Sequence, residues 1–200
     1  MIPRHLKIGI VALLGGVSIA GIYLSRMRGH VESEAQVPVK DNRPVAPPAA
    51  GPTEPVTLYV AYDQPGVLRA QGASIALPTG RQQRAQELLR ALIEIYLGNN
   101  SPHVLPSGAE VREVYLVDPG LAVIDVNAAF ADGHRSGVLV EGLTVASMVQ
   151  TLFGNLPGIT RVKFLVEGKD RETLAGHADI SSFLDTAEIA QMASQLQAGQ

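Results

Sequence analysis

The stretch that decides the fold is Val111–Asp185, which includes Val-Ile-Asp-Val at 123–126, Thr-Leu-Phe at 151–153 and Leu-Val-Glu-Gly at 165–168. Its succession of patterns predicts a β-hairpin, a helix, a strand and a turn-rich tail. The stretch contains no phosphate-binding loop, no nucleophile elbow and no residues at metal-ligand spacing. It therefore predicts a fold but carries no recognisable chemistry.

The hairpin, helix and strand each follow from a local pattern. Apolar and polar residues alternate over 111–117 and 121–127, and the Asp-Pro-Gly at 118–120 between them is a turn signal. Helical spacing predicts a helix over 139–155, and alternation returns over 161–167. The apolar stripe of this helix is expected to consist of Val145, Ala146, Val149, Leu152, Phe153 and Leu156.

The segments on either side of this stretch complete the predicted fold. A strand is expected over 56–62, and 67–77 is expected to hold one or two short strands because a glycine interrupts it. Thr79 reads as the N-cap of a helix that ends before Gly98, and a weak terminal helix is expected over 186–197. Together these elements predict an α+β fold, with two helices packed on one side of a mostly antiparallel or mixed sheet.

The N-terminal segment Ile8–Leu24 is uncharged and apolar or small throughout. As a helix it would span roughly 26 Å at 1.5 Å per residue, which is at the short limit for crossing a bilayer. We expect an N-terminal membrane helix that precedes the folded part. The alternative is a cleaved secretory signal, with Ser-Ile-Ala at 18–20 as its cleavage site.

The composition divides the chain into four parts. Residues 1–28 are the expected anchor or signal peptide, and 29–55 form a proline-rich linker that is too poor in apolar residues to build a core. Residues 56–186 form the folded domain, and 187–200 are a tail that includes the end of the terminal helix.

Charge separates the N-terminus from the remainder. The first 30 residues hold four of the 16 basic residues and none of the 19 acidic ones, which leaves the other 170 with a formal charge of −7. An acidic domain repels nucleic acid, so nucleic acid is not expected as a partner.

Seven short phrases in the folded part occur in a characteristic order and spacing. They are Leu58-Tyr59-Val60, Gln86–Leu89, Leu105–Val111, Ala122–Phe130, Glu141–Thr151, Pro157–Val162 and Leu174–Ser181. Through them residues 57–185 resemble the GerMN domain of sporulation and spore-germination proteins. The resemblance implies a fold similar to ring-building motifs of secretion-type assemblies, and it implies no enzymatic activity, cofactor or catalytic residue. The founding family member carries two such domains on a lipid anchor, whereas this chain shows one.

Two groups of polar residues are the most enzyme-like features of the chain. Asp132, His134 and Ser136 lie within one glycine-rich loop, whereas catalytic triads converge from separate elements around an oxyanion hole. His177 and Asp179 lack a third ligand at usable spacing for zinc. We therefore expect none of the five to be catalytic or to bind metal. The first group is expected to lie in a solvated loop and His177 to hydrogen-bond nearby backbone.

The remaining candidates have structural interpretations. Asp125 is expected either to point outward from its strand or to accept backbone donors. Three histidines look isolated, namely His5, His30 and His103. The aromatic residues are expected to pack in the core rather than line a groove, and they are Tyr59, Tyr62, Tyr96, Tyr115 and Phe130.

These observations predict a non-enzymatic, single-pass membrane protein of the cell envelope, anchored through residues 8–24, with its domain on the extracytoplasmic side. The domain is expected to contact other envelope proteins in an assembly, and no cofactor is expected. The alternative function is a small-ligand or cell-wall-glycan binding module, which requires a concave site with converging donors. A homo-oligomer is a further alternative, because Ala12, Gly16 and Ala20 place small residues on one face of the anchor, where two helices could pair.

Overall fold

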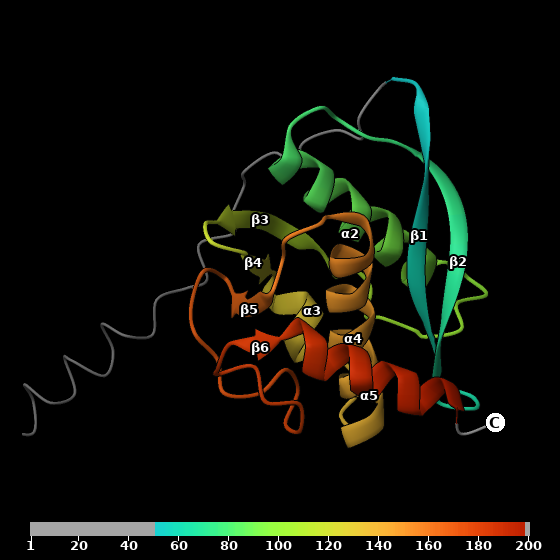
Figure 1. The fold of residues 1–200 in the computed structure, drawn as a ribbon. Helices are drawn as coiled ribbons and strands as arrows, with labels where there is room; N and C mark the ends of the chain where they lie inside the picture. The colour runs from blue at the N-terminus through green and yellow to red at the C-terminus, as the bar shows by residue number, and fades with distance from the viewer. Residues whose placement is uncertain (1–50, 199–200) are drawn as a thin grey trace, which may run out of the picture. The chain divides into compact units, whose positions relative to one another are not determined.

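The structure, a computed structural model, describes residues 51–198. Along the chain, three pairs of strands are each followed by one or two helices (Figure 1). They are β1 (Thr53–Tyr62), β2 (Val67–Ala76), α2 (Arg81–Leu97), β3 (Val111–Val117), β4 (Leu121–Val126), α3 (Ala128–Asp132), α4 (Val138–Asn155), β5 (Arg161–Val166), β6 (Leu184–Asp185) and α5 (Thr186–Ala198).

The predicted membrane helix lies outside the described residues. Within residues 51–198, no helix combines the length and the apolar character needed to cross a bilayer. The prediction for Ile8–Leu24, like that for most of the linker, stays a prediction.

The predicted hairpin, helix and last strand are confirmed, and they build a four-stranded mixed sheet in the order β3-β4-β5-β6. β3 and β4 pair antiparallel, whereas β4 and β5 pair parallel because α4 carries the chain back across the sheet. Gly120 in the hairpin turn has a φ of +74°, and a Cβ there would lie 2.6 Å from the carbonyl oxygen of Gly158. Only glycine suits this position.

The expectation of a single sheet was wrong, because β1 and β2 form a separate two-stranded sheet. β2 is one continuous strand, since Gly72 keeps its place in the ladder opposite Thr57 without a bulge. β1 begins at Thr53, within the segment expected to be linker, and Thr53 pairs with Ala76 at the end of β2.

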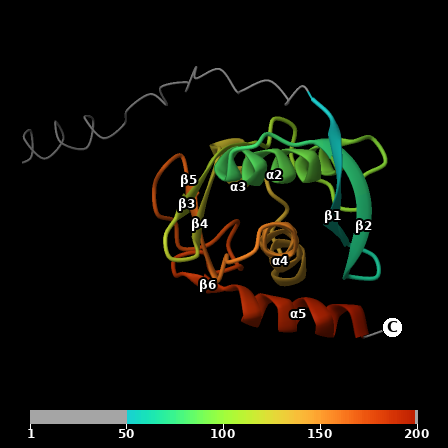
Figure 2. The same cartoon turned by 45° about the horizontal axis from the view of Figure 1, so that its top comes forward.

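Helix α4 lies between the two sheets, with α2 on one side and α5 on the other (Figure 2). The prediction of two helices on one side of one sheet is therefore corrected. Because α4 has neighbours all around, nearly every residue from Leu143 to Leu152 is buried, rather than a single stripe. Phe153, predicted to belong to that stripe, is exposed.

Two details of the helix ends also differ from prediction. Gly80, not Thr79, precedes the first residue of α2, and no side chain caps this end. The short helix α3 was not predicted, although Asn127 caps it by accepting a hydrogen bond from the Phe130 N–H. The terminal helix and the end of α2 at Gly98 are confirmed.

Candidate functional site

The first half of α4 carries three buried polar side chains at intervals of three residues, namely Glu141, Thr144 and Ser147. Residues three apart lie on neighbouring positions of a helix surface, so the three form a polar row on an otherwise apolar helix. None of the three has exposed surface. Each is hydrogen-bonded to a segment distant in sequence, and these bonds define the candidate site.

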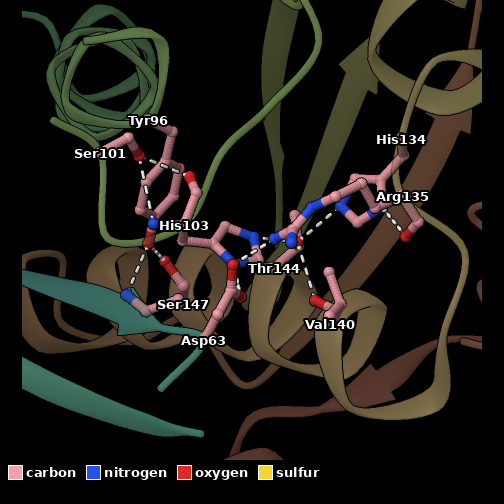
Figure 3. Close-up of polar contacts among 10 residues, drawn as sticks. Asp63, Tyr96, Ser101, His103, His134, Arg135, Val140, Thr144 and Ser147 are labelled. Carbon is pink, nitrogen blue, oxygen red and sulfur yellow. Dashed lines mark hydrogen bonds and ion pairs between the residues drawn. The ribbon is translucent and has the colours of Figure 1, made fainter. Parts of the chain in front are cut away.

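Thr144 lies at the centre of a group that we call the polar cluster, which consists of Asp63, His103, His134, Arg135 and Thr144 (Figure 3). The Thr144 Oγ1 is 2.6 Å from His103 Nε2 and 2.8 Å from His134 Nε2. His103 Nδ1 is 2.7 Å from Asp63 Oδ1, and the Arg135 guanidinium donates to the other oxygen of Asp63. The cluster thus joins the β1–β2 turn and two further loops to α4.

A second set of bonds adjoins the cluster. The Tyr96 hydroxyl of α2 accepts a hydrogen bond from the Ala61 N–H at 2.8 Å and pairs with Ser147 Oγ. The Tyr96 ring lies edge-on to the His103 ring, with their centroids 4.9 Å apart. Burial raises the pKa of Tyr96 to about 12, so its hydroxyl stays protonated.

Burial and hydrogen bonding set the protonation of the polar cluster. Burial lowers the pKa of His103 and of His134, because an imidazolium loses its hydration there. The Asp63 carboxylate opposes this shift at His103. Burial alone would raise the pKa of Asp63, but hydrogen bonds from His103 and Arg135 lower it below its ordinary value. Asp63 is therefore ionised, and it accepts the His103 Nδ1–H.

The hydrogen bonds fix the tautomer of each neutral imidazole. His103 Nδ1 faces a carboxylate, and His134 Nδ1 lies 2.7 Å from the carbonyl oxygen of Arg135. Carboxylates and carbonyls only accept, so both Nδ1 atoms carry the proton and both Nε2 atoms present lone pairs to Thr144. The threonine has one hydroxyl proton, and three acceptors surround it, namely the two Nε2 atoms and the Val140 carbonyl at 3.1 Å.

We expect the shared Thr144 hydroxyl to affect two measurable properties, namely the tautomers of the two imidazoles and the stability of the domain. In nitrogen-15 NMR spectra at pH 8, both imidazoles should appear as Nδ1–H tautomers, and both should protonate below their ordinary pKa of 6.5. Thr144→Val should cost about 1–3 kcal/mol in the free energy of unfolding, because it removes the one hydroxyl donor that the surrounding buried acceptors share. Thr144→Ser keeps the hydroxyl and is the matched control, with a smaller loss and unchanged tautomers. Nε2–H tautomers in the wild type would contradict the assignment.

The polar cluster has the order of groups found in hydrolase triads, with a carboxylate on Nδ1 and a hydroxyl on Nε2 of the same imidazole. Two features separate it from a working triad. Thr144 is 0% exposed, and a second imidazole, that of His134, lies against another side of the Thr144 hydroxyl. A substrate carbonyl has no approach to this oxygen in the structure.

Glu141 organises the other side of the polar row. Its two carboxylate oxygens accept the N–H groups of four residues, namely Gly137, Ala175, His177 and Ala178, at 2.9–3.0 Å. Burial alone would raise its pKa, but these four bonds lower it to about 2. Glu141 is thus a buried, ionised carboxylate that attaches the 175–178 loop to the start of α4. We call this group the Glu141 anchor.

The structure corrects two predictions about histidines. His134, expected in a solvated loop, is buried and bonded to Thr144. His103, expected to be isolated, has no exposed surface and makes two side-chain hydrogen bonds. Sequence reasoning also missed Thr144 as their shared partner. Its only signal was a polar residue at regular spacing within an apolar helix.

The other candidates lie apart from the polar cluster. Asp132 pairs with Arg171 on the surface, and the Asp179 carboxylate accepts from Ser181. Ser136 contacts His177 Nδ1 at 3.1 Å, and the same nitrogen is 3.1 Å from Glu141, so these three do not form a relay through both imidazole nitrogens.

Asp125 is buried on β4, and it accepts the Gly168 N–H and pairs with Arg112. This agrees with the second of its two expected roles. In the described part of the chain, no three or more histidine, aspartate or glutamate side chains are grouped in a way that could hold a metal ion.

Comparison with known proteins places this α+β domain. Residues 57–172 match the Germane family, described as "Sporulation and spore germination", and this match covers more than half of the chain. The chain therefore belongs to the Germane family, as the sequence resemblance indicated. No curated protein sequence matched it.

Two solved structures from Bacillus subtilis are similar to this chain. The tandem GerMN domains of the sporulation protein GerM share 22% identity over 68% of this chain and 47% of theirs, with a TM-score of 0.52. The first GerMN domain of that protein shares 23% identity over 66% of this chain and 98% of its own, with a TM-score of 0.46. At these identities the likeness concerns the fold alone.

Proposed function

We propose that this chain is a non-enzymatic, membrane-anchored protein of the cell envelope, whose Germane domain makes protein–protein contacts in an extracytoplasmic assembly. Membership of the Germane family supports this, since that family is tied to sporulation and germination and is not a known enzyme family. The uncharged segment 8–24 and the proline-rich linker support attachment to a membrane.

The observation that carries the proposal is how the polar row is used. The carboxylate, imidazole and hydroxyl groups that could perform chemistry are buried and bonded to one another or to backbone. They fix four loops onto α4 instead of facing a substrate. A glycan-binding module would need such donors to converge on an open concave site. The polar row therefore favours a rigid contact domain over both an enzyme and a ligand-binding module.

Two segments that the polar cluster joins each carry an exposed apolar side chain. Val138 at the start of α4 is 75% exposed, and Val104, which follows His103, is 53% exposed. Both belong to segments that Thr144 holds together through hydrogen bonds to His103 and Val140.

A topology experiment tests the proposal. Protease added to intact spheroplasts should digest the domain while a cytoplasmic control protein survives, because residues 31–200 are expected to lie outside the membrane. Membranes washed with high salt should retain the undigested protein. Full protection of the domain would overturn the orientation. Release of a mature form beginning at Gly21 would replace the anchor with a cleaved signal.

A further inference from the structure

The two long edges of the β1–β2 sheet differ in how their backbone groups are used. On β1, the N–H groups of Thr57, Tyr59 and Ala61 donate to side chains of the helices rather than to β2. Their acceptors are Asn155 Oδ1 at 3.1 Å, Thr151 Oγ1 at 3.0 Å and Tyr96 Oη at 2.8 Å. Asn155 also donates to the Thr57 carbonyl at 2.7 Å. The outer edge of β1 is thus closed to a further strand.

The register of the sheet shows which groups of β2 point away from β1. Thr57, Tyr59 and Ala61 lie opposite Gly72, Ala70 and Leu68. In an antiparallel ladder, opposed residues either both bond across the pair or both point outward. The outward peptide groups of β2 therefore belong to five residues at even positions, namely Leu68, Ala70, Gly72, Ser74 and Ala76. Within residues 51–198, no hydrogen bond joins these outward groups to another segment.

β2 also lacks the usual features that protect a sheet edge. Its ten residues contain no proline or lysine, its pairing shows no bulge, and Arg69 is its only charge. Figure 1 shows β2 as the outer strand of its sheet, with β1 between it and α2, while α5 packs against part of β2. By contrast, the β3 edge has a bulge beside Glu113 and its Arg112 carbonyl accepts from Gln86, and β6 is only two residues long.

We propose that β2 is a pairing edge, through which a second copy of this chain adds its own β2 antiparallel about a twofold axis at Gly72. Gly72 is the middle of the five outward groups, so this register uses all of them symmetrically. An open row of backbone donors and acceptors is matched by another extended strand, and joins two sheets into one.

The side chains of β2 fit this register. Ala70 would face Ser74 of the second copy, and Arg69 would face Ile75, so no like charges oppose each other. A Cβ at Gly72 would have no atom within 4 Å, and Ala70 and Ser74 are exposed and small. The three central outward positions of β2 therefore carry no bulky side chain. This inference rests on the proposed role in protein contacts, for which it names the surface and the partner.

The absence of cysteine from the chain makes a disulfide test specific. In Gly72→Cys, the two thiols would lie opposite each other, with Cα atoms about 5.5 Å apart, which is within the range that a disulfide spans. Oxidation of membranes that contain the full-length variant should give a covalent homodimer on a non-reducing gel. Glu94→Cys, on the exposed face of α2, measures random collision and should give several-fold less.

Two further variants test the register. Ser74→Cys alone should crosslink weakly, because its two copies would be offset by about 14 Å along the strands at 3.4 Å per residue. Coexpression of Ser74→Cys with Ala70→Cys should restore crosslinking between unlike chains.

Gly72→Cys dimers no more abundant than those of Glu94→Cys would overturn the proposal, as would crosslinking to a different protein instead. If that result came from a protein whose domain is still digested in intact spheroplasts, only the pairing edge would be lost and the proposed function would stand.

Discussion

Glu141→Gln is expected to destabilise the domain by about 3–5 kcal/mol, because about two buried N–H groups lose their acceptor at about 1–3 kcal/mol each. The carboxylate accepts four backbone N–H groups from the 175–178 loop and the start of α4. The amide of glutamine replaces one acceptor oxygen by a donor, so some of these buried N–H groups lose their partner. Urea unfolding of the purified protein, followed by circular dichroism, measures the loss.

The matched control is Glu94→Gln, which changes the same chemical group on the exposed face of α2. It should alter the free energy of unfolding by no more than about 0.5 kcal/mol. If the Glu141 variant is too unstable to purify, limited proteolysis in cell extracts should show its loss of protection beside an intact control. Equal stability of the two variants would contradict the role of the Glu141 anchor.

The Glu141 carboxylate also makes the free energy of unfolding depend on pH, in a direction that its lowered pKa determines. Its pKa is about 2 in the folded chain, against an ordinary value of 4.5. The stabilisation is therefore fully present above pH 4.5 and is lost as the pH falls towards 2, with a size of roughly 3 kcal/mol at 1.36 kcal/mol per pKa unit. The stability gap between the wild type and Glu141→Gln should shrink over that interval. A gap that is constant from pH 7 to pH 2 would show that the charge is not responsible.

Phe164→Ala is expected to cost about 3–5 kcal/mol, the usual loss when a buried phenylalanine is truncated. Phe164 lies in the middle of β5, opposite Ile124 of β4, and is 1% exposed. Truncation leaves a cavity between the four-stranded sheet and its covering helices, in a domain whose total stability is expected to be about 5–15 kcal/mol. Denaturant unfolding should show a lower midpoint with a similar slope.

Phe153→Ala provides the comparison for the same substitution outside the core. Phe153 is 41% exposed on α4, so its truncation should cost much less than that of Phe164. Similar losses for the two variants would argue against the inward orientation of Phe164 on β5.

The parts of the fold that the sequence predicted correctly depend on local patterns. The β3–β4 hairpin, α4 and β5 each have a periodicity and a turn signal within their own residues. The division into two sheets could not be predicted in this way, because it depends on which strands meet in space. Gly72 illustrates the limit, since a glycine that suggests an interruption keeps its place in an unbroken ladder opposite Thr57.

The candidate site could not be predicted from local sequence patterns either, because its residues meet only in the folded structure. His103 and His134 are 31 positions apart, and neither is next to a residue that marks it as buried. Only the enclosure of α4 by both sheets brings the two imidazoles to one hydroxyl. The role of Asp125 was easier to predict, because a carboxylate within an apolar strand must either face water or accept hydrogen bonds. In the structure it accepts them from Gly168 and Arg112.

The position of α4 also has a consequence for the order in which the chain folds. The β1–β2 and β3–β4 hairpins join neighbouring segments and need little loop closure, whereas β4 and β5 pair in parallel only after the whole of α4 has crossed between them. The β1–β2 sheet packs against α4 and β3 packs against α2, so neither hairpin can complete its hydrophobic burial alone. We therefore expect the docking of α4 to be the cooperative step of folding, with both sheets gaining their stability together.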